Sequence, residues 1–568
     1  MVETGLTISL SRSFKRFIEI IRLEKQEVSA IYFYSILSGL IQLSLPLGIQ
    51  AIINFAQVAV GRSKLPASMW LLMSLVVGGV FIAGLLQVNQ MRVVEKIQQR
   101  IFSRYALEFT YKIPRLENVA VDGLHVPELV NRFFDVVVLQ KALSKLLLDI
   151  PLAVIQVLFG LILLSFYNSL FIVLGILLII ISYLIFYYTG KKGLEASIRE
   201  SNYKYDIVGW IEELARSFKS FKITGKYNLH LSKTDQLLKG YLSARTDHFH
   251  VLQFQYWSLV VFKLFITAAM LFIGALLLMN QQLNIGQFIA AEIVILTVLL
   301  AVEKLVLSLD KAYDLLTSLE KLSSVTDKAI ENNVGLSMPK DRQGISIEMS
   351  NLSFGYKENL PLLKDINLKI ESGQKVCIMG DAGAGKSVLM EMLTASLLSY
   401  EGIFLVNGLP LRNYNIQSYR EMMGVFYHEQ DIFKATLFEN ITMGNDAIGA
   451  NELMAAAKKI GLSEYISALP FGLETMLQPT GKGLSTIIAK KILLLRAVIG
   501  SPKLLLMDEP FELAGGEHCK DIADHILGMK ETTAVIITGN HDFARQCDLV
   551  ITLAGGTLAK SENLSTLS

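Results

Sequence analysis

The sequence predicts a polytopic α-helical membrane domain with six transmembrane helices, followed by an α/β P-loop domain. Three observations carry this prediction: an apolar composition, long apolar spans within the first 310 residues, and a phosphate-binding motif beyond them. The chain has 568 residues, of which 52% are hydrophobic and 18% charged. Ordinary soluble proteins of this length are less apolar. The composition therefore indicates a membrane region joined to a soluble domain.

Charge and cysteine content limit the classes of partner. The net charge is only +2, so no global field points to nucleic acid as a partner. Cys377, Cys519 and Cys547 lie in the C-terminal half without metal-ligand spacing, as expected of reduced cytosolic thiols. The first 11 residues contain no apolar core with a cleavage site, so we expect no signal peptide.

Six apolar spans come near or exceed the length of about 20 residues that a helix needs to cross a bilayer. They cover residues 29–59, 67–91, 146–166, 170–188, 256–279 and 285–309. The short loops 167–169 and 280–282 are uncharged, whereas the long stretches 92–145 and 191–250 are rich in Lys and Arg. The positive-inside rule places the long stretches in the cytoplasm. We therefore expect a multi-pass protein of the inner (cytoplasmic) membrane, surrounded by lipid.

Four segments follow from this pattern. Residues 1–28 form a cytoplasmic N-terminal segment, in which the basic, amphipathic stretch 12–25 suits an elbow helix on the inner membrane surface. Residues 29–310 form the transmembrane domain, the polar residues 311–344 form a linker, and residues 345–568 form the α/β domain. This last domain begins with apolar residues that alternate with polar ones, as in a half-buried strand.

The α/β domain contains the pattern G-x-x-x-x-G-K-[ST] between a strand-like run at 375–379 and a helix-like run at 388–393. The motif consists of Gly380, Asp381, Ala382, Gly383, Ala384, Gly385, Lys386 and Ser387. Its backbone N–H groups would wrap phosphates, Lys386 would reach the β- and γ-phosphates, and the Ser387 hydroxyl would bind Mg²⁺. The following helix N-terminus favours anions. An ordinary glycine-rich turn would not require a strand directly before it and a helix directly after it.

A second motif supplies acidic groups. The apolar run at 504–507 ends in Asp508, which would hold the Mg²⁺ shell, and Glu509 follows, where it could polarise an attacking water. Without a P-loop in the same chain, Asp508 and Glu509 would indicate only the charged end of a strand. Behind a P-loop they favour nucleotide hydrolysis.

With these motifs the chain resembles half-transporters of the ABC exporter type, in which six membrane helices precede one ABC ATPase domain. The resemblance covers nearly the whole chain and implies ATP and Mg²⁺ as ligands. It also implies that Tyr356 stacks on adenine, that Glu509 is the catalytic carboxylate, and that the ATPase domain lies in the cytoplasm. One ATPase domain cannot supply both faces of the shared ATP site, so a second half-transporter chain is implied, either identical or different.

Several family motifs are altered. The signature L-S-G-G-Q reads Leu484-Ser485-Thr486-Ile487-Ile488, which retains Ser485 as a nucleotide contact but replaces both glycines. Side chains then stand where backbone must approach phosphate closely. Four further positions depart from the family: His428 in the Q-loop, Pro479 at an exporter glutamate, Gly515 in the D-loop and Gly539 at the switch histidine. We therefore expect ATP binding with reduced hydrolysis.

The favoured function is ATP-driven export of a substrate by a dimer. Family substrates range from peptides and proteins to lipids and drugs, and the run at 285–290 leans towards type I secretion or peptide export. Closure of the ATPase domains would be relayed through cytoplasmic loops near 122–126 and 203–206. Two alternatives remain open: a degenerate subunit of a heterodimer, and an ATP-binding membrane regulator with little or no turnover. Glu509 argues against the regulator, and the altered signature argues for it.

Lys263, Glu292 and Glu303 lie inside the predicted spans. A charge there costs about 2.5–3.5 kcal/mol on insertion scales, so each should face a partner or water. Lys263 and Glu303 come out at similar depth, so they could pair between the fifth and sixth helices. Glu292 either lines the substrate route or, if the span boundaries are a turn off, lies at the membrane interface.

Overall fold

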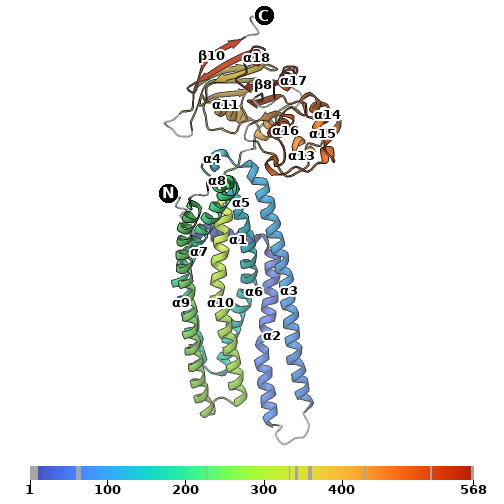
Figure 1. Ribbon diagram of the computed structural model, residues 1–568. Helices are drawn as coiled ribbons and strands as arrows, with labels where there is room; N and C mark the ends of the chain where they lie inside the picture. The colour runs from blue at the N-terminus through green and yellow to red at the C-terminus, as the bar shows by residue number, and fades with distance from the viewer. Residues whose placement is uncertain are drawn as a thin grey trace. The chain divides into compact units, whose positions relative to one another are not determined.

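The computed structural model describes residues 10–58, 66–224, 227–331, 333–339, 343–355, 361–427, 430–511 and 515–563. The chain divides into two compact units, which are taken one at a time (Figure 1). The first is helical and consists of Met1–Arg115 and Gly123–Lys328. The second contains both β-sheets and consists of Leu116–Asp122 and Ala329–Ser568. The second unit is therefore assembled from two separate stretches of sequence.

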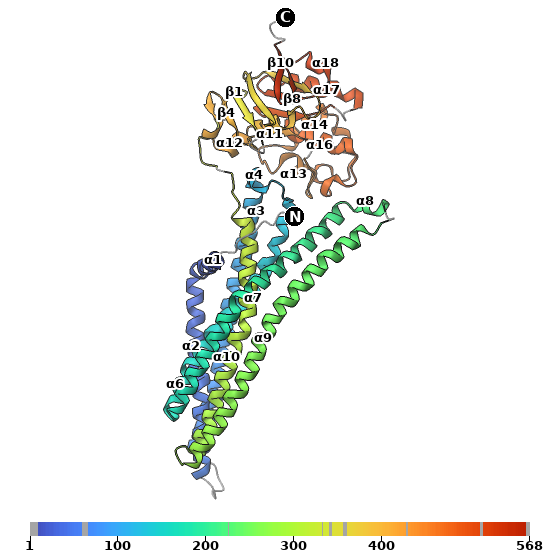
Figure 2. The same ribbon diagram turned by 90° about the vertical axis from the view of Figure 1, so that its left-hand side faces the viewer.

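The helical unit is dominated by long helices, which run side by side in Figures 1 and 2. The helices of this unit are α1 (Leu10–Leu23), α2 (Lys25–Val58), α3 (Ala67–Lys112), η1 (Ile113–Arg115), α5 (Val126–Val130), η2 (Asn131–Phe134), α6 (Asp135–Tyr167), α7 (Leu170–Arg216), α8 (Phe218–Ile223), α9 (Leu229–Met279) and α10 (Ile285–Thr326). In the described part of the chain, six helices are long and apolar enough to cross a membrane. They are α2, α3, α6, α7, α9 and α10, which confirms the six spans expected from the sequence.

These helices are much longer than the apolar spans that identified them. The 51 residues of α9 rise about 76 Å at 1.5 Å per residue, whereas the hydrocarbon core is about 30 Å thick. The expected relay loop at 203–206 is wrong, because these residues lie inside the 47-residue α7. Apolarity marks only the part of a helix that suits lipid, while its polar continuation keeps the same backbone hydrogen bonds.

The core of the helical unit lies where α6 and α10 pack together. Ala291, Val294 and Val298 of α10 are fully buried, and Gly160 of α6 faces the two valines. A Cβ atom at Gly160 would collide with the side chain of Val298. The glycine therefore lets the two helices approach closely, as small residues do at the interfaces of membrane helices.

The second unit has two sheets. The antiparallel sheet has the order β2 (Leu363–Ile370), β1 (Ile347–Phe354), β4 (Glu401–Val406), β5 (Leu409–Pro410). The larger sheet has the order β10 (Thr557–Asn563), β9 (Leu549–Ala554), β3 (Lys375–Gly380), β8 (Thr533–Ile537), β7 (Leu504–Asp508), β6 (Met423–Phe426). Its strands pair in parallel except at β10, which is antiparallel to β9.

Helices complete the second unit. They are α4 (Asn118–Val121), α11 (Lys386–Leu393), η3 (Leu411–Asn413), α12 (Ile416–Arg420), α13 (Leu437–Thr442), α14 (Ala450–Lys459), α15 (Ser463–Ala468), η4 (Gly472–Glu474), η5 (Pro479–Gly481), α16 (Thr486–Val498), α17 (Gly515–Leu527) and α18 (His541–Ala544). The central strands β7 and β8 are continuous buried apolar runs, as parallel strands covered on both faces usually are.

The topology decides where polar groups gather. The carboxyl ends of parallel strands lie at one edge of a sheet, where open α/β folds commonly bind ligands. Since β8 lies between β3 and β7, this edge brings together the P-loop after β3, the turn after β8 and the acidic pair at the end of β7. The sheet order therefore assembles the candidate site from three distant parts of the sequence.

Candidate nucleotide-binding site

The P-loop connects β3 to α11, as the sequence predicted. Gly380 has φ 146° and Gly385 has φ 98°, conformations that side chains rarely adopt. A Cβ atom at Gly380 would also collide with the carbonyl oxygen of Leu553, and one at Gly385 would lie 2.9 Å from the side chain of Leu363. Gly383 and Ser387 are exposed. The loop thus offers backbone and hydroxyl groups to a ligand from a tightly fixed path.

Lys386 provides the cation of this loop. Its ammonium group donates hydrogen bonds to the carbonyl oxygens of Gly380 and, at 3.1 Å, Asp381. Leu389 N–H donates to the Gly385 carbonyl oxygen at 3.0 Å, which starts the helix directly behind the lysine. Lys386 is the first residue of this helix, and the first N–H groups of a helix lack partners within it, an arrangement suited to anionic phosphate.

Asp508 and Glu509 lie at the same edge of the sheet. Asp508 ends β7 and is paired in register with Ile537 of β8. Glu509 has a left-handed backbone with φ 48°, and its N–H donates to the Ile537 carbonyl oxygen at 2.9 Å. A non-glycine residue in such a conformation costs on the order of 1–3 kcal/mol. This bond holds the strained turn that directs the Glu509 side chain.

The turn after β8 contacts the acidic pair. The Gly539 N–H donates to Oε2 of Glu509 at 3.4 Å. The side chain of the following Asn540 caps α18 by accepting from the N–H groups of Asp542 and Phe543. Gly539 thus supplies a main-chain contact to the carboxylate at the position where the family pattern has a histidine.

Burial perturbs two titratable groups around the site. Burial raises the pKa of Tyr427, at the end of β6, to about 12, and the charges of Glu391 and Asp508 act in the same direction. Burial lowers the pKa of Lys375, whose ammonium group donates to the carbonyl oxygens of Gly373, Met529 and Thr532. The Tyr427 hydroxyl donates to the Thr394 hydroxyl oxygen at the end of α11 at 3.4 Å, and Lys375 lies in β3, the strand before the P-loop.

The altered signature forms a helix start. Ser485 is the N-cap of α16, and its hydroxyl accepts from the Ile488 N–H at 3.2 Å. Thr486 and Ile487 are therefore the first two helical residues, and both are exposed. Within the described residues, no hydrogen bond joins Ser485 to the P-loop. The sheet edge thus gathers residues 380–387, Asp508 and Glu509 of the predicted site, and not Ser485.

Tyr356 and His428 lie outside the described residues. Gly515 is the first residue of α17, and Pro479 opens the short helix η5.

Sequence reasoning missed the turn between β9 and β10. The Gly556 N–H donates to the Ala384 carbonyl oxygen at 3.2 Å, which supports the P-loop from outside. Gly556 has φ 80°, and a Cβ atom there would collide with the Leu362 carbonyl oxygen. The pair Gly555-Gly556 between two apolar runs was the available signal, since such pairs favour hairpin turns.

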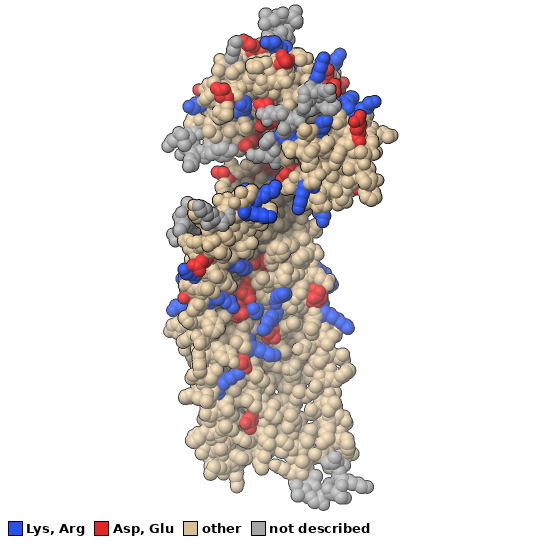
Figure 3. Space-filling view, viewed as in Figure 1, with Lys and Arg blue, Asp and Glu red and all other residues tan. Residues whose placement is uncertain are grey.

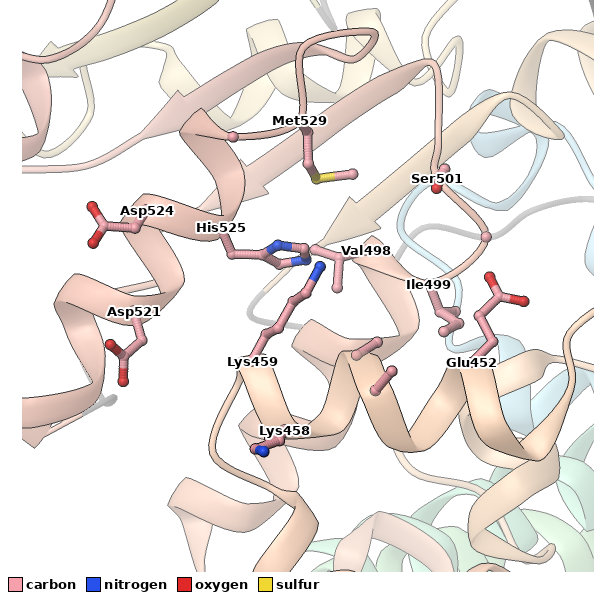
Figure 4. A pocket seen from close by; sticks show the side chains of 14 residues that line it. Glu452, Lys458, Lys459, Val498, Ile499, Ser501, Asp521, Asp524, His525 and Met529 are labelled. Carbon is pink, nitrogen blue, oxygen red and sulfur yellow. The ribbon is translucent and has the colours of Figure 1, made fainter.

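A cleft of about 790 Å³ lies elsewhere in this unit, between α14 and α17 (Figure 4). None of its lining residues belongs to the P-loop or to the acidic pair. In Figure 4 the His525 ring points towards the ammonium group of Lys459. Burial and then the charge of Lys459 lower the pKa of His525. Since opposed acidic and basic groups line this cleft, its volume alone does not indicate a phosphate site.

In the helical unit, Lys263 of α9 forms an ion pair with Glu303 of α10, which confirms the expected pairing. Glu292 is half-buried, and no described residue bonds to its carboxylate. Figure 3 shows few charged side chains on the viewed face of the lower part of this unit. Charges there are sparse, as the cost of placing them in lipid requires.

The chain matches two family descriptions. "ABC transporter transmembrane region" matches residues 28–301, and "ABC transporter" matches residues 363–512. The first match falls on the region of the six long helices, and the second contains the P-loop and the acidic pair. The two matches thus cover both units in the order that the sequence suggested.

Named proteins show the same likeness at lower coverage. The chain is 25% identical over 335 residues to the cyclolysin secretion/processing ATP-binding protein CyaB of Bordetella pertussis, covering 59% of this chain and 47% of that protein. It is 27% identical over 256 residues to the ATP-dependent lipid A-core flippase of Saccharophagus degradans, covering 44% and 43%. The chain spans less than half the length of each of these relatives.

The fold has a solved counterpart. The structure of a bacterial Atm1-family ABC exporter with ATP bound superposes with a TM-score of 0.81 at 19% sequence identity. The superposition covers 98% of this chain and 96% of the other. At this identity the likeness establishes the fold.

Proposed function

Because the chain is a half-transporter of the ABC exporter type, with six candidate membrane helices before one ABC ATPase unit, we propose that it binds ATP with Mg²⁺ and drives export. The observation that carries this proposal is the sheet edge, where β3, β8 and β7 bring Lys386, Asp508 and Glu509 together. A cation, Mg²⁺-binding oxygens and a carboxylate are the groups that phosphoryl transfer requires.

Each residue has a proposed role in binding. The backbone of residues 380–385 wraps the phosphates, and Lys386 exchanges its contacts with the loop carbonyls for phosphate oxygens. Ser387 and Asp508 hold the Mg²⁺ shell, and Tyr356 stacks on the adenine. Mg²⁺ supplies charge neutralisation on the phosphates. These assignments explain why the three glycines of the loop, Gly380, Gly383 and Gly385, have backbone conformations that side chains rarely adopt.

Hydrolysis is proposed to be slow. Glu509 orients and polarises the attacking water, and the Gly539 N–H holds its carboxylate from the neighbouring turn. A main-chain donor at this position replaces a side chain that could reach the nucleotide. Preorganised charge is usually the largest single contribution to such catalysis. The absence of that side chain therefore lowers the rate of ATP hydrolysis more than the affinity for ATP.

The proposed assembly is a dimer with a second half-transporter chain. Ser485 at the start of α16 would complete the nucleotide site of that second chain rather than of its own. The location proposed is the inner (cytoplasmic) membrane, with the ATPase unit in the cytoplasm. The basic helix α1 is suited to the surface of that membrane.

The transport route is proposed to run along α10. Glu292 and Glu303 are 11 residues apart, which is close to three helical turns, so they share one face of α10. Lys263 neutralises Glu303, and Glu292 is left to face water or the transported substrate. The substrate class stays among peptides, proteins, lipids and small amphiphiles.

One observation favours a second candidate, a degenerate subunit of a heterodimer. The side chains of Thr486 and Ile487 occupy the exposed first positions of α16, where the family pattern has two glycines. A partner chain with an intact signature would then support hydrolysis at the P-loop described above. An ATP-binding regulator without turnover is the remaining alternative.

The test is reconstitution of the full-length chain in liposomes, alone and with a candidate partner chain. We expect Mg²⁺-dependent binding of a fluorescent ATP analogue in both preparations and faster ATP hydrolysis with a heterodimeric partner. Glu509→Gln should reduce the hydrolysis rate of the chain alone while leaving nucleotide binding intact. A chain that binds no nucleotide would overturn the proposal, and binding with no hydrolysis in any preparation would favour the regulator.

A further inference from the structure

The far end of the phosphate-binding helix carries a charged contact outside every motif discussed above. Arg420, the last residue of α12, donates two hydrogen bonds to the carboxylate of Glu331, at 2.5 and 2.8 Å. The pair is bidentate, a geometry that is stronger and more directional than a single contact. The Glu331 side chain is 10% exposed and the Arg420 side chain 32%, so the pair is partly shielded from water.

The same guanidinium group also binds the end of α11. Arg420 Nε donates to the Thr394 carbonyl oxygen, and Nη2 to the Ala395 carbonyl oxygen, each at 3.1 Å. Thr394 is the C-cap of α11, whose last carbonyl groups lack partners within the helix. A cation there is also favoured by the helix dipole. Arg420 thus joins Glu331 to the helix that begins at the P-loop.

The helix between these two ends is short and firmly packed. It has eight residues, of which Leu389, Met390, Met392 and Leu393 are fully buried. Tyr419, also fully buried, donates its hydroxyl hydrogen to the Leu393 carbonyl oxygen at 2.9 Å. A movement at the N-terminus of such a rigid element is transmitted to its C-terminus rather than absorbed.

Glu331 belongs to the segment that follows α10, here called the connector (residues 329–339). Arg420 and its neighbours bind the connector repeatedly. The Asn415 amide donates to the Asn333 carbonyl oxygen at 2.5 Å, and the Met338 N–H donates to the Ser418 hydroxyl at 3.0 Å. At the other end, Ile330 forms an antiparallel bridge with Leu116, and the Glu117 N–H donates to the Ala329 carbonyl oxygen at 3.1 Å.

We propose that Arg420 and Glu331 are positioning residues that carry the nucleotide state of the P-loop to the connector. Phosphate at the N-terminus of α11 shifts this helix, Arg420 follows its terminal carbonyls, and Glu331 follows Arg420. The connector precedes the ATPase sheets in the sequence and also holds Leu116, so the shift reaches both stretches from which this unit is built. The inference rests on the proposed ATP binding and adds a route by which that binding is sensed.

Hydrogen exchange of the full-length chain in lipid nanodiscs tests this route. Exchange is measured with and without a slowly hydrolysed ATP analogue and Mg²⁺, and binding of a fluorescent analogue is measured on the same samples. In the parent chain we expect nucleotide to slow exchange in connector peptides. Glu331→Gln should still bind nucleotide but lose this slowing. Glu531→Gln, which alters an exposed ion pair with Lys503, is the matched control and should keep it.

A double-mutant cycle guards against a purely structural effect. Glu331→Gln and Arg420→Lys should each abolish the nucleotide-dependent slowing, and the double variant should be no worse than either, because the two side chains act as one unit. The proposal is overturned if Glu331→Gln retains the slowing, or if the parent binds nucleotide without any change in the connector. If the parent binds no nucleotide, the proposed function itself fails. If Glu331→Gln does not fold, the folded Arg420→Lys variant decides between the same outcomes.

Discussion

The backbone N–H of Gly539 donates a hydrogen bond of 3.4 Å to Oε2 of Glu509. The contact joins the turn after β8 to the end of β7, two neighbouring strands of the parallel sheet. A Cβ atom at Gly539 would meet no atom within 4 Å, so the turn has room for a side chain that it does not carry. This space makes the missing side chain an experimentally replaceable part of the site.

We predict that Gly539→His raises ATP hydrolysis. An imidazole at this position can hydrogen-bond to the transferred phosphate or the attacking water, which the main-chain donor cannot. Phosphate release by the purified chain in lipid measures the effect. Gly539→Ala is the control, since it adds only a Cβ atom to the same open space. A histidine variant that folds, binds ATP and is no faster than the alanine variant contradicts the prediction.

Lys386→Ala should abolish nucleotide binding at ordinary concentrations. Charge-assisted hydrogen bonds of this kind contribute about 1.5–3 kcal/mol, and Lys386 is the cation that the P-loop itself provides. Titration with a fluorescent ATP analogue measures the loss. Lys458→Ala removes an exposed lysine of α14 and should leave the affinity unchanged. Undiminished binding by Lys386→Ala would remove the assignment of the site.

Restoring glycine at both Thr486 and Ile487 should raise ATP hydrolysis more than either single change. The two residues open the same helix N-terminus, so their effects on the rate should couple rather than add. Glycine weakens a helix by about 1 kcal/mol at interior positions, so thermal unfolding must first show that each variant folds. Phosphate release measures the rate. If the folded double variant is as slow as the parent, the signature is not the limiting defect.

The ion pair between Lys263 and Glu303 should stabilise the helical unit chiefly by avoiding an unpaired charge. Glu303→Gln leaves Lys263 without its partner, at a cost of about 2.5–3.5 kcal/mol if that charge stays in lipid. The midpoint of thermal unfolding in detergent should fall. Adding Lys263→Met should recover most of this loss, because both charges are then absent. Equal unfolding midpoints for the parent and Glu303→Gln would show that the pair is dispensable.

His525 should make the ATPase unit less stable in mild acid. Burial and Lys459 hold the pKa of His525 below its ordinary value, so the unfolded chain binds a proton at higher pH than the folded chain. The free energy of unfolding therefore falls as the pH drops below about 6.5. Thermal unfolding of the parent and of His525→Gln between pH 7.5 and pH 5 measures this. The variant should show a flatter profile, and parallel profiles would contradict the assignment.

Local patterns predicted those parts of the molecule that depend on neighbouring residues. The P-loop after β3 depends on glycines within a few residues of one another, and the six spans depend on continuous apolarity. The pairing of Lys263 with Glu303 followed from helical rise alone. Each of these features is determined by residues within one loop, within one helix or at one depth in the membrane. A single sequence is therefore enough to predict it.

Features that depend on distant segments could not be predicted in this way. The contact between Gly539 and Glu509 requires β8 to lie beside β7, which neither strand encodes by itself. The support of Ala384 by Gly556 likewise requires the hairpin of β9 and β10 to lie beside β3. The extension of α7 through residues 203–206 was missed because polar helical surface resembles loop in composition. The positions of such contacts depend on how segments that are distant in the sequence pair in the fold.

The bridge between Leu116 and Ile330 has a consequence for how the chain is made. The segment Leu116–Asp122 leaves the ribosome before α6, α7, α9 and α10, whereas the rest of its unit follows them. Leu116 can therefore meet Ile330 only after the helices between them have been synthesised. Four long helices must be synthesised and inserted while this early segment waits for its partner.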